Sequence, residues 1–126
     1  ITEMKKPIPG LAVSVHSGGA QNDRNVSVVV AQAADELLTM NDIHVSAVLN
    51  ESDDGVSISA RSDGSVNVQT MMEELGGGGH QTVAGVQIKG AKAEDLIPKI
   101  IEMAKEQMKE SDSDEGNSAE GRKEVG

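Results

Sequence analysis

The sequence predicts an α/β (α+β) fold in which about three helices pack on a small mixed β-sheet. Three observations support this class. Short runs rich in Val and Ile alternate with amphipathic segments, two of these runs flank a hairpin turn signal, and helix-stop residues follow the amphipathic segments. The expected order along the chain is β-α-β-β-α-β-α. Strands that pair partly as a hairpin, with helices between the others, imply a mixed sheet.

The first third of the chain should supply one strand and one helix. Residues 1–9 carry two prolines and no apolar period, so we expect a linker there. The run at 11–15 is a short strand candidate. Between Ser27 and Met40 apolar residues recur at helical spacing, which predicts a helix, and Asn41 is suited to end it.

Two strands, at 44–49 and 56–62, are expected to form a hairpin. They flank the sequence Asp-Asp-Gly at 53–55, which is a turn signal. In the second strand apolar and polar residues alternate, so one face is apolar and Arg61 shares the other face with serines.

The region after the hairpin predicts a helix, a glycine-rich segment and a strand. The helix begins at Ser65 or Asn67, which are both suitable N-caps, and carries one apolar stripe as far as Leu75. Gly76 follows at the place where a C-cap glycine belongs. Residues 82–89 are then expected to form a strand.

The last helix has the clearest pattern, with an apolar stripe on one face and charges on the other. Pro98 should lie in its first turn, which places the start near Glu94 or Asp95. Residues 111–126 are polar and rich in Gly and Ser, so we expect a disordered acidic tail there. The ordered domain is therefore expected to cover 10–110.

Composition narrows the class of function. The 126 residues amount to one small domain, and the absence of Cys excludes disulfides, thiolate metal sites and a cysteine nucleophile. Without Phe, Tyr or Trp the chain lacks the stacking platforms that bind single-stranded nucleic acid. A net charge of −10 argues against broad binding to duplex DNA, but it leaves room for one short anionic ligand in a local site. No run is apolar over the length of a membrane span, and no signal peptide opens the chain.

The most informative stretch consists of Gly76, Gly77, Gly78 and Gly79, followed by His80. Glycine tolerates positive φ and lets backbone N–H groups approach a ligand, and successive N–H groups can form an anion nest. A histidine at the edge adds a donor whose charge is adjustable near neutral pH. The alternative interpretation is a flexible linker, which the flanking helix and strand disfavour.

Arg61 is a second candidate, because its planar guanidinium suits a phosphate. The alternative for Arg61 is a surface ion pair, and for His80 it is a hydrogen bond to nearby backbone. Arg61 and His80 become stronger candidates for phosphate binding only if Arg61 and the glycine run meet at the same end of the sheet. No catalytic site is complete, because the histidines are scattered and no P-loop or nucleophile elbow is present. The residues therefore indicate a phosphate- or nucleotide-binding module.

The string GGGGH, followed by Ala84-Gly85, resembles the glycine-rich signature of the DHH-associated subdomain of DHH-superfamily phosphoesterases. The strings AQAADELLTM and ISARS resemble one branch of that superfamily, the bacterial cyclic-di-AMP phosphodiesterases. The resemblance covers about residues 10–108. After GGGGH this chain reads QTVAG, whose Ala-Gly ending is closer to the nano-RNase and exonuclease relatives.

The resemblance implies a division of labour between two domains. A separate N-terminal DHH domain of the same polypeptide, joined through residues 1–9, would hold two Mn²⁺ ions, whereas this chain would bind no metal or other cofactor. Cyclic-di-AMP would be opened to 5′-pApA, and the isolated chain would be inactive. Phosphodiesterases of this branch usually carry N-terminal membrane helices. The resemblance therefore implies a cytoplasmic domain with no membrane contact of its own.

By position match, the resemblance assigns substrate contact to the glycine run at 76–79, to His80, and more weakly to Arg61 and Ser62. Three other functions stay open. They are the C-terminal half of an oligoribonuclease or pAp phosphatase, an RNA-binding appendage without catalysis, and an interaction module such as a homodimer contact.

Overall fold

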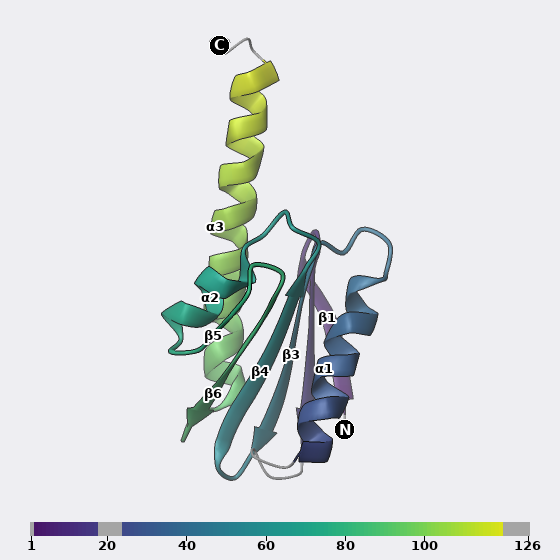
Figure 1. Ribbon diagram of the computed structural model, residues 1–126, viewed down its shortest axis with the longest axis vertical. Coiled ribbons are helices and arrows are strands. Elements are labelled where there is room, and N and C mark those ends of the chain that lie inside the picture. The colour runs from purple at the N-terminus through teal and green to yellow at the C-terminus, as the bar shows by residue number, and fades with distance from the viewer. Residues whose placement is uncertain (1, 18–23, 120–126) are drawn as a thin grey trace.

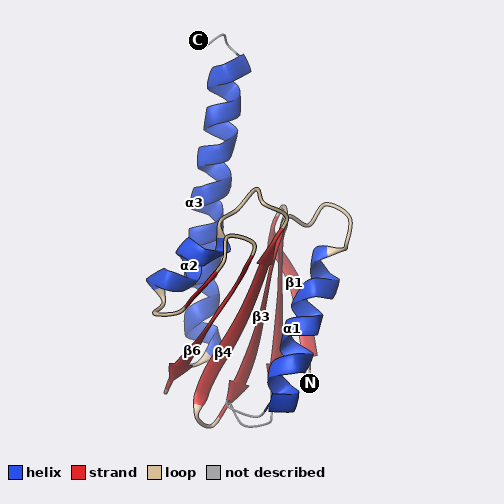
Figure 2. Ribbon diagram, in the orientation of Figure 1, coloured by secondary structure: helices blue, strands red, loops and turns tan. Residues whose placement is uncertain are grey.

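The computed structural model describes the backbone of residues 2–17 and 24–119 and the side chains of 5–17 and 28–109. Nine elements follow one another along the chain (Figures 1 and 2). They are β1 (Thr2–Ile8), β2 (Leu11–Ser17), α1 (Arg24–Leu38), β3 (Val45–Ser52), β4 (Gly55–Ser62), α2 (Val68–Glu74), β5 (Gly78–Gly79), β6 (Val83–Lys89) and α3 (Ala93–Ala119).

The strands form one six-stranded sheet in the order β1-β2-β3-β4-β6-β5. Only β2 and β3, which are connected through α1, pair in parallel, and all the other neighbours are antiparallel. This arrangement confirms the predicted mixed sheet, the predicted hairpin and the order of the four strands expected from the sequence.

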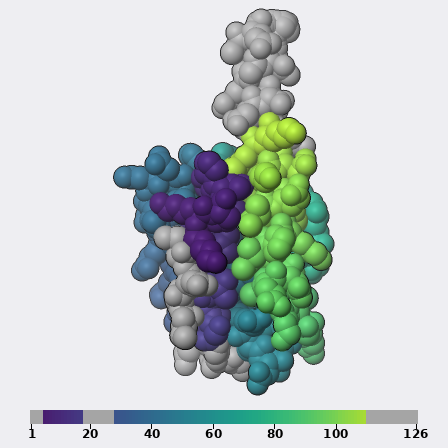
Figure 3. All heavy atoms as spheres, turned by 180° about the vertical axis from the view of Figure 1, so that it is seen from behind, coloured from purple at the N-terminus to yellow at the C-terminus, as the bar shows by residue number. Residues whose placement is uncertain are grey.

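The helices cover both faces of the sheet, as Figure 2 shows. α1 packs on β3 and β4 from one side, while α2 packs on β6 and α3 on β2 and β3 from the other. Seen from behind, the side chains of β1 and α3 lie side by side (Figure 3). Among the helical residues that the structure describes, no stretch is long and apolar enough to cross a bilayer.

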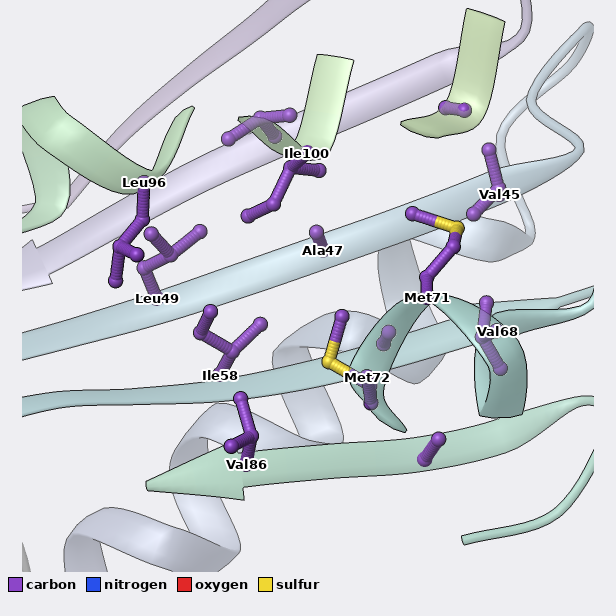
Figure 4. Packing of buried hydrophobic residues seen from close by; sticks show 14 of the residues in the cluster. Val45, Ala47, Leu49, Ile58, Val68, Met71, Met72, Val86, Leu96 and Ile100 are labelled. Atoms are coloured by element: carbon purple, nitrogen blue, oxygen red, sulfur yellow. The ribbon is translucent and has the colours of Figure 1, made fainter. Parts of the chain in front are cut away.

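The main core lies between the sheet and the α2–α3 side. Alternate residues of the central strands face this core, because successive side chains of a strand point to opposite faces. Figure 4 shows how the side chains from the strands meet those from the two helices. The labelled residues are Val45, Ala47, Leu49, Ile58 and Val86 from the strands, and Val68, Met71, Met72, Leu96 and Ile100 from the helices. Methionine fills the irregular spaces that aromatic rings would otherwise occupy.

A smaller apolar cluster lies beneath α1, where Val30 and Ala34 pack on Val48 of β3. The neighbouring positions on this face are polar. One of them is Ser46, whose hydroxyl is buried and donates to the carbonyl of Ala34 at 2.7 Å. This face therefore combines a small apolar cluster with buried polar groups such as Ser46.

The prediction of a linker at 1–9 is wrong for most of that segment, because Thr2–Ile8 forms the edge strand β1. Proline has no N–H to donate, so it is confined to edge strands and irregular positions. Pro7 lies where the β1–β2 register shifts, between Lys5 and Ile8, and β1 has a partner on one side only.

One expectation for the last helix needs correction. α3 begins at Ala93, so Pro98 lies in its second turn rather than its first. The backbone of α3 is described as far as Ala119. Residues 120–126 of the expected tail lie outside the described residues.

The start of α2 follows from its cap, and α1 differs slightly from its predicted bounds. The side chain of Asn67 accepts a hydrogen bond from the N–H of Thr70 at 3.1 Å, so Asn67 is the N-cap of α2 and Ser65 is not. α1 begins at Arg24, earlier than the predicted Ser27, and ends at Leu38.

Candidate functional site

The glycine run leaves α2 through a Schellman motif. The N–H of Gly77 donates to the carbonyl of Met72 at 2.8 Å, and the N–H of Gly76 donates to that of Glu73 at 3.1 Å. This hydrogen-bond pair closes the end of a helix when the residue after the C-cap is left-handed. Gly76 has a φ of 98°, which explains the glycine there and confirms its predicted capping role.

Gly77 and Gly79 are glycines because they lie against β6. A Cβ added to Gly77 would lie 2.3 Å from the carbonyl oxygen of Gly85. A Cβ added to Gly79 would lie 2.5 Å from the carbonyl oxygen of Val83, and φ at Gly79 is 144°. Both positions therefore exclude any side chain.

Gly78 is under neither constraint. Its φ lies outside the left-handed region, and a Cβ added there would meet nothing within 4 Å. Gly78 pairs with Gly85 of β6, and Gly85 pairs with Ser59 of β4. Three small residues thus form a row across the edge of the sheet, and Gly78 ends this row in open space.

The predicted nest of free N–H groups is wrong for three residues of the run. The N–H groups of Gly76 and Gly77 cap α2, and the N–H of His80 donates to the carbonyl of Val83 at 2.6 Å. These donors are consumed by the fold, so a ligand here would meet the open surface at Gly78 and the exposed side chain of His80.

Arg61 meets the glycine run at one end of the sheet, as the hypothesis required. Arg61 pairs with Val83 of β6, and Val83 accepts the hydrogen bond from His80. With neighbouring strands about 4.8 Å apart, the backbones of Arg61 and His80 lie within about 10 Å of each other.

The guanidinium of Arg61 is engaged in the ion pair that the sequence left as an alternative. Its Nε donates to Oδ1 of Asp35 on α1 at 2.8 Å, and its Nη1 donates to the carbonyl of Ala60 at 3.0 Å. The Arg61 side chain is 12% exposed, whereas that of Asp35 is 66% exposed. The pair therefore holds the largely buried guanidinium in position beside a solvated carboxylate.

Ser62 lies on the opposite face from Arg61 and has a structural role. It is buried, and its hydroxyl accepts hydrogen bonds from the N–H groups of Gly64 and Val66 at 3.0 and 3.3 Å. These bonds close the turn that leads from β4 toward α2. The assignment of Ser62 to substrate contact stays a prediction.

Sequence reasoning missed a His–Asp pair at the same end of the sheet. Nδ1 of His44 lies 2.6 Å from Oδ2 of Asp63, and since a carboxylate only accepts, Nδ1 carries the shared proton. The register of the hairpin could have revealed this pair. Val45 pairs with Ser62, so the residue before Val45 and the residue after Ser62, which are His44 and Asp63, lie opposite each other.

The pKa of Asp63 is low. Partial burial alone would raise the pKa of this carboxyl, but hydrogen bonds from His44 and from the backbone and hydroxyl of Ser65 outweigh burial. They lower the pKa of Asp63 from 3.8 to about 2. The carboxylate is therefore ionised at every physiological pH.

Two hollows open on the described part of the surface, away from the glycine run. One has a volume of about 840 Å³ and lies between the β1–β2 turn, His44 and Met108. The other has a volume of about 600 Å³ and lies between α2 and α3. Across the residues described, no three His, Cys, Asp or Glu side chains gather so as to hold a metal ion. Neither of these two hollows is lined by Gly78, Arg61 or His80.

Comparison with known proteins gives this surface a context. The model of the DHHA1 domain matches residues 11–110. The cyclic-di-AMP phosphodiesterase GdpP of Geobacillus thermodenitrificans is 51% identical over 71 residues, which are 56% of this chain and 11% of that protein. PdeA of Listeria monocytogenes, also named as a cyclic-di-AMP phosphodiesterase, is 42% identical over 93 residues, or 73% of this chain and 14% of that protein.

More distant relatives match a larger part of the chain. The bifunctional oligoribonuclease and PAP phosphatase NrnA of Thermus thermophilus is 30% identical over 102 residues, which are 79% of this chain and 30% of that protein. Among solved structures, an exopolyphosphatase-related protein from Bacteroides fragilis shares the fold with a TM-score of 0.65 at 17% identity, over 82% of this chain and 31% of its own. The chain therefore spans between about a tenth and a third of the length of the proteins it matches.

Proposed function

The chain belongs to the DHHA1 domain family of DHH phosphoesterases, and from this premise we propose that it is the substrate-binding half of a phosphodiesterase that hydrolyses cyclic-di-AMP to 5′-pApA. The similarity to GdpP and PdeA supports this choice of substrate. The single observation that carries the binding role is the open surface at Gly78.

Gly78 has no structural reason to be glycine. Its three neighbours in the run are explained by a helix cap or by contact with β6, whereas a side chain at Gly78 would enter empty space. A bare backbone beside empty space is the arrangement that lets a ligand approach the chain closely. We infer that the sugar-phosphate backbone of the substrate passes over Gly78.

The groups around Gly78 fit the parts of a nucleotide. The guanidinium of Arg61 is held in position and has donors besides Nε, so it suits a phosphate oxygen. The side chain of Val83, opposite Arg61, is 45% exposed and offers an aliphatic surface for a base. His80 adds an exposed imidazole that can donate to a phosphate or a ribose.

The remaining chemistry would belong to a partner domain. Because the chain spans only 11–14% of the phosphodiesterases GdpP and PdeA, we propose that a DHH domain of the same polypeptide faces this surface and carries the Mn²⁺ ions. A pair of such ions supplies a hydroxide nucleophile and neutralises charge on the phosphate. The residues of this chain would bind and orient the phosphodiester, which can supply a large part of the rate enhancement.

A second candidate is the C-terminal half of an oligoribonuclease or PAP phosphatase. The similarity to NrnA, over a longer stretch than the GdpP match, favours it, as does the QTVAG sequence after His80. Both candidates use the same surface and differ in the substrate. Under both candidate functions, we propose that this domain lies in the cytoplasm, where such nucleotides are found.

The test compares two adjacent glycines. Gly78→Val should leave the free energy of unfolding nearly unchanged, since the new side chain enters open space in an edge strand. It should weaken binding of cyclic-di-AMP by about tenfold or more, or about 1.4 kcal/mol, because the side chain occupies the ligand's place. Gly77→Ala is the matched control and should destabilise the fold, because its Cβ collides with the backbone of Gly85. Calorimetric titration and thermal unfolding measure the two effects.

Full binding by Gly78→Val would contradict the proposal. A competition experiment on the longer protein, with cyclic-di-AMP, 5′-pApA, short oligoribonucleotides and PAP, identifies which of these is the substrate. The isolated chain should show no hydrolysis with Mn²⁺, and turnover by the chain alone would overturn the division of labour.

A further inference from the structure

One side chain of α3 is bonded to both backbone groups of the residue that starts α2. The N–H of Asn67 donates to Oε1 of Gln107 at 2.8 Å, and Nε2 of Gln107 donates to the carbonyl of Asn67 at 2.9 Å. A carboxamide carries an acceptor oxygen and a donor NH2 group in one plane, so two such bonds to one residue define both its position and its orientation. The Gln107 side chain thus fixes the point at which α2 begins.

The start of α2 holds, in turn, the loop that follows His80. The first N–H of a helix has no partner inside the helix, and here the N–H of Val68 donates to the carbonyl of Gln81 at 2.9 Å. The adjacent Asn67 caps the helix through its side chain, and its backbone N–H and carbonyl both bond to Gln107. Hydrogen bonds therefore connect α3 to the start of α2, and the start of α2 to Gln81.

The same loop is held on its other side by the sheet. The carbonyl of Thr82 accepts from the N–H of Ser62 at the end of β4 at 3.0 Å, and the N–H of His80 donates to Val83. The sheet is rigid because its strands pair over most of their length. The attachment to α2 depends instead on where this short helix begins.

Direct contacts between α2 and α3 are few, although the buried side chains of α2 anchor this helix in the main core. A hollow of about 600 Å³ separates α2 from α3 on the outer side, and Asn67 and Gln107 lie in its lining with Thr70 and Met103. Across this hollow the carboxamide of Gln107 bridges the two helices. Its two bonds therefore connect α2 to α3 on the side where the two helices do not pack on each other.

We propose that Gln107 is a positioning residue of the substrate surface. It fixes the start of α2, so that the N–H of Val68 holds Gln81 and the preceding His80 faces the ligand. The role in binding rests on the proposed function, whereas the mechanical link does not. Gln107 itself touches no substrate.

The experiment replaces Gln107 and a matched glutamine with leucine. Gln107→Leu keeps the size of the side chain and removes both bonds to Asn67. Gln69→Leu on α2 removes only a hydrogen bond to Glu73 on the same helix, so it is the control. Gln107→Glu keeps the acceptor and loses the donor. Backbone amide shifts of residues 80–82 and the affinity for cyclic-di-AMP are measured for each folded variant.

Gln107→Leu is expected to move the amide signals of 80–82 and to weaken cyclic-di-AMP binding by about tenfold, since small displacements of a positioned group have large effects. Gln107→Glu should give an intermediate result, and Gln69→Leu should leave both readings unchanged. If Gln107→Leu leaves the signals of 80–82 in place, or moves them with no loss of affinity, the proposal is overturned. If the unaltered chain does not bind cyclic-di-AMP, the proposed function fails, and the amide signals still decide whether Gln107 holds the loop. Should Gln107→Leu not fold, the comparison of Gln107→Glu with the unaltered chain decides in the same way.

Discussion

The four glycines at 76–79 have different physical explanations. Gly76 adopts a positive φ, Gly77 and Gly79 lie against the backbone of β6, and Gly78 faces open space. Composition alone treats these residues as equivalent. Gly78 is therefore the residue of the run that the fold itself does not require to be glycine.

Arg61 provides a charge whose loss should affect binding more than stability. Arg61→Met keeps much of the length of the side chain and removes the charge. Since its partner Asp35 is well exposed, the free energy of unfolding should change by no more than about 1 kcal/mol. Binding of cyclic-di-AMP should fall by about tenfold or more, because the phosphate loses a charge-assisted donor.

Lys89→Met is the control for Arg61→Met, because Lys89 lies at the opposite end of β6, where it pairs with Gly55. It removes the same charge from the chain and should leave the affinity almost unchanged. Equal losses of affinity in the two variants would show that overall charge, and not the position of Arg61, controls binding. Both affinities are read by calorimetric titration at one fixed ionic strength.

Asp63 should make folding sensitive to acid. Its pKa in the folded chain is about 2, below the ordinary value of 3.8, so the ionised form is favoured by folding. The stability it contributes is fully present above pH 3.8 and is lost as the pH falls from 3.8 toward 2. Denaturant unfolding of the unaltered chain and of Asp63→Asn should differ by a constant amount above this window and converge within it. A difference that stays constant down to pH 2 would contradict the assignment.

At the scale of elements, the capping of α2 can be separated from its attachment to α3. Asn67→Ala removes the side-chain cap and should destabilise the chain by about 1 kcal/mol. The backbone groups of Asn67 still bond to Gln107, so the amide signals of residues 80–82 should stay in place. Thermal unfolding and amide spectra test the two halves of this prediction. Displacement of 80–82 by Asn67→Ala would mean that the cap, and not Gln107, holds the loop.

Elements with a strong side-chain period were predictable from the sequence. The hairpin, the strand before α3 and α3 itself follow from alternation or helical spacing, because burial on one face selects apolar residues at those intervals. β1 was missed because prolines and lysines mask an edge strand, which needs only one partner. β5 was missed because two glycines carry no side-chain pattern at all.

The site was predictable in part. The glycine run, His80 and Arg61 were identified from residue chemistry, and the strand register brings them to one end of the sheet as the hypothesis required. The expected free N–H groups were wrong, since sequence does not reveal which donors the helix cap consumes. The ion pair between Arg61 and Asp35 joins residues far apart in the chain, so only the fold reveals it.

At the scale of the whole molecule, the sheet has one apolar face and one face with a polar margin. α2 and α3 cover the main core, whereas α1 covers the middle of the other face. The row from Ser59 through Gly85 to Gly78 lies toward the edge of the sheet that β5 forms. The proposed second domain would have to supply positive charge for an anionic substrate, because this chain carries a net charge of −10.

Binding at Gly78 is tested most directly by a map of the amide signals that change when cyclic-di-AMP is titrated into the isotopically labelled chain. Saturable changes are expected at Gly78, His80 and Arg61, with little change at Ile8 and Gly10, which line the 840 Å³ hollow. Changes centred on that hollow, with the signals of Gly78 and His80 unmoved, would show that the ligand binds elsewhere and would contradict the proposed site.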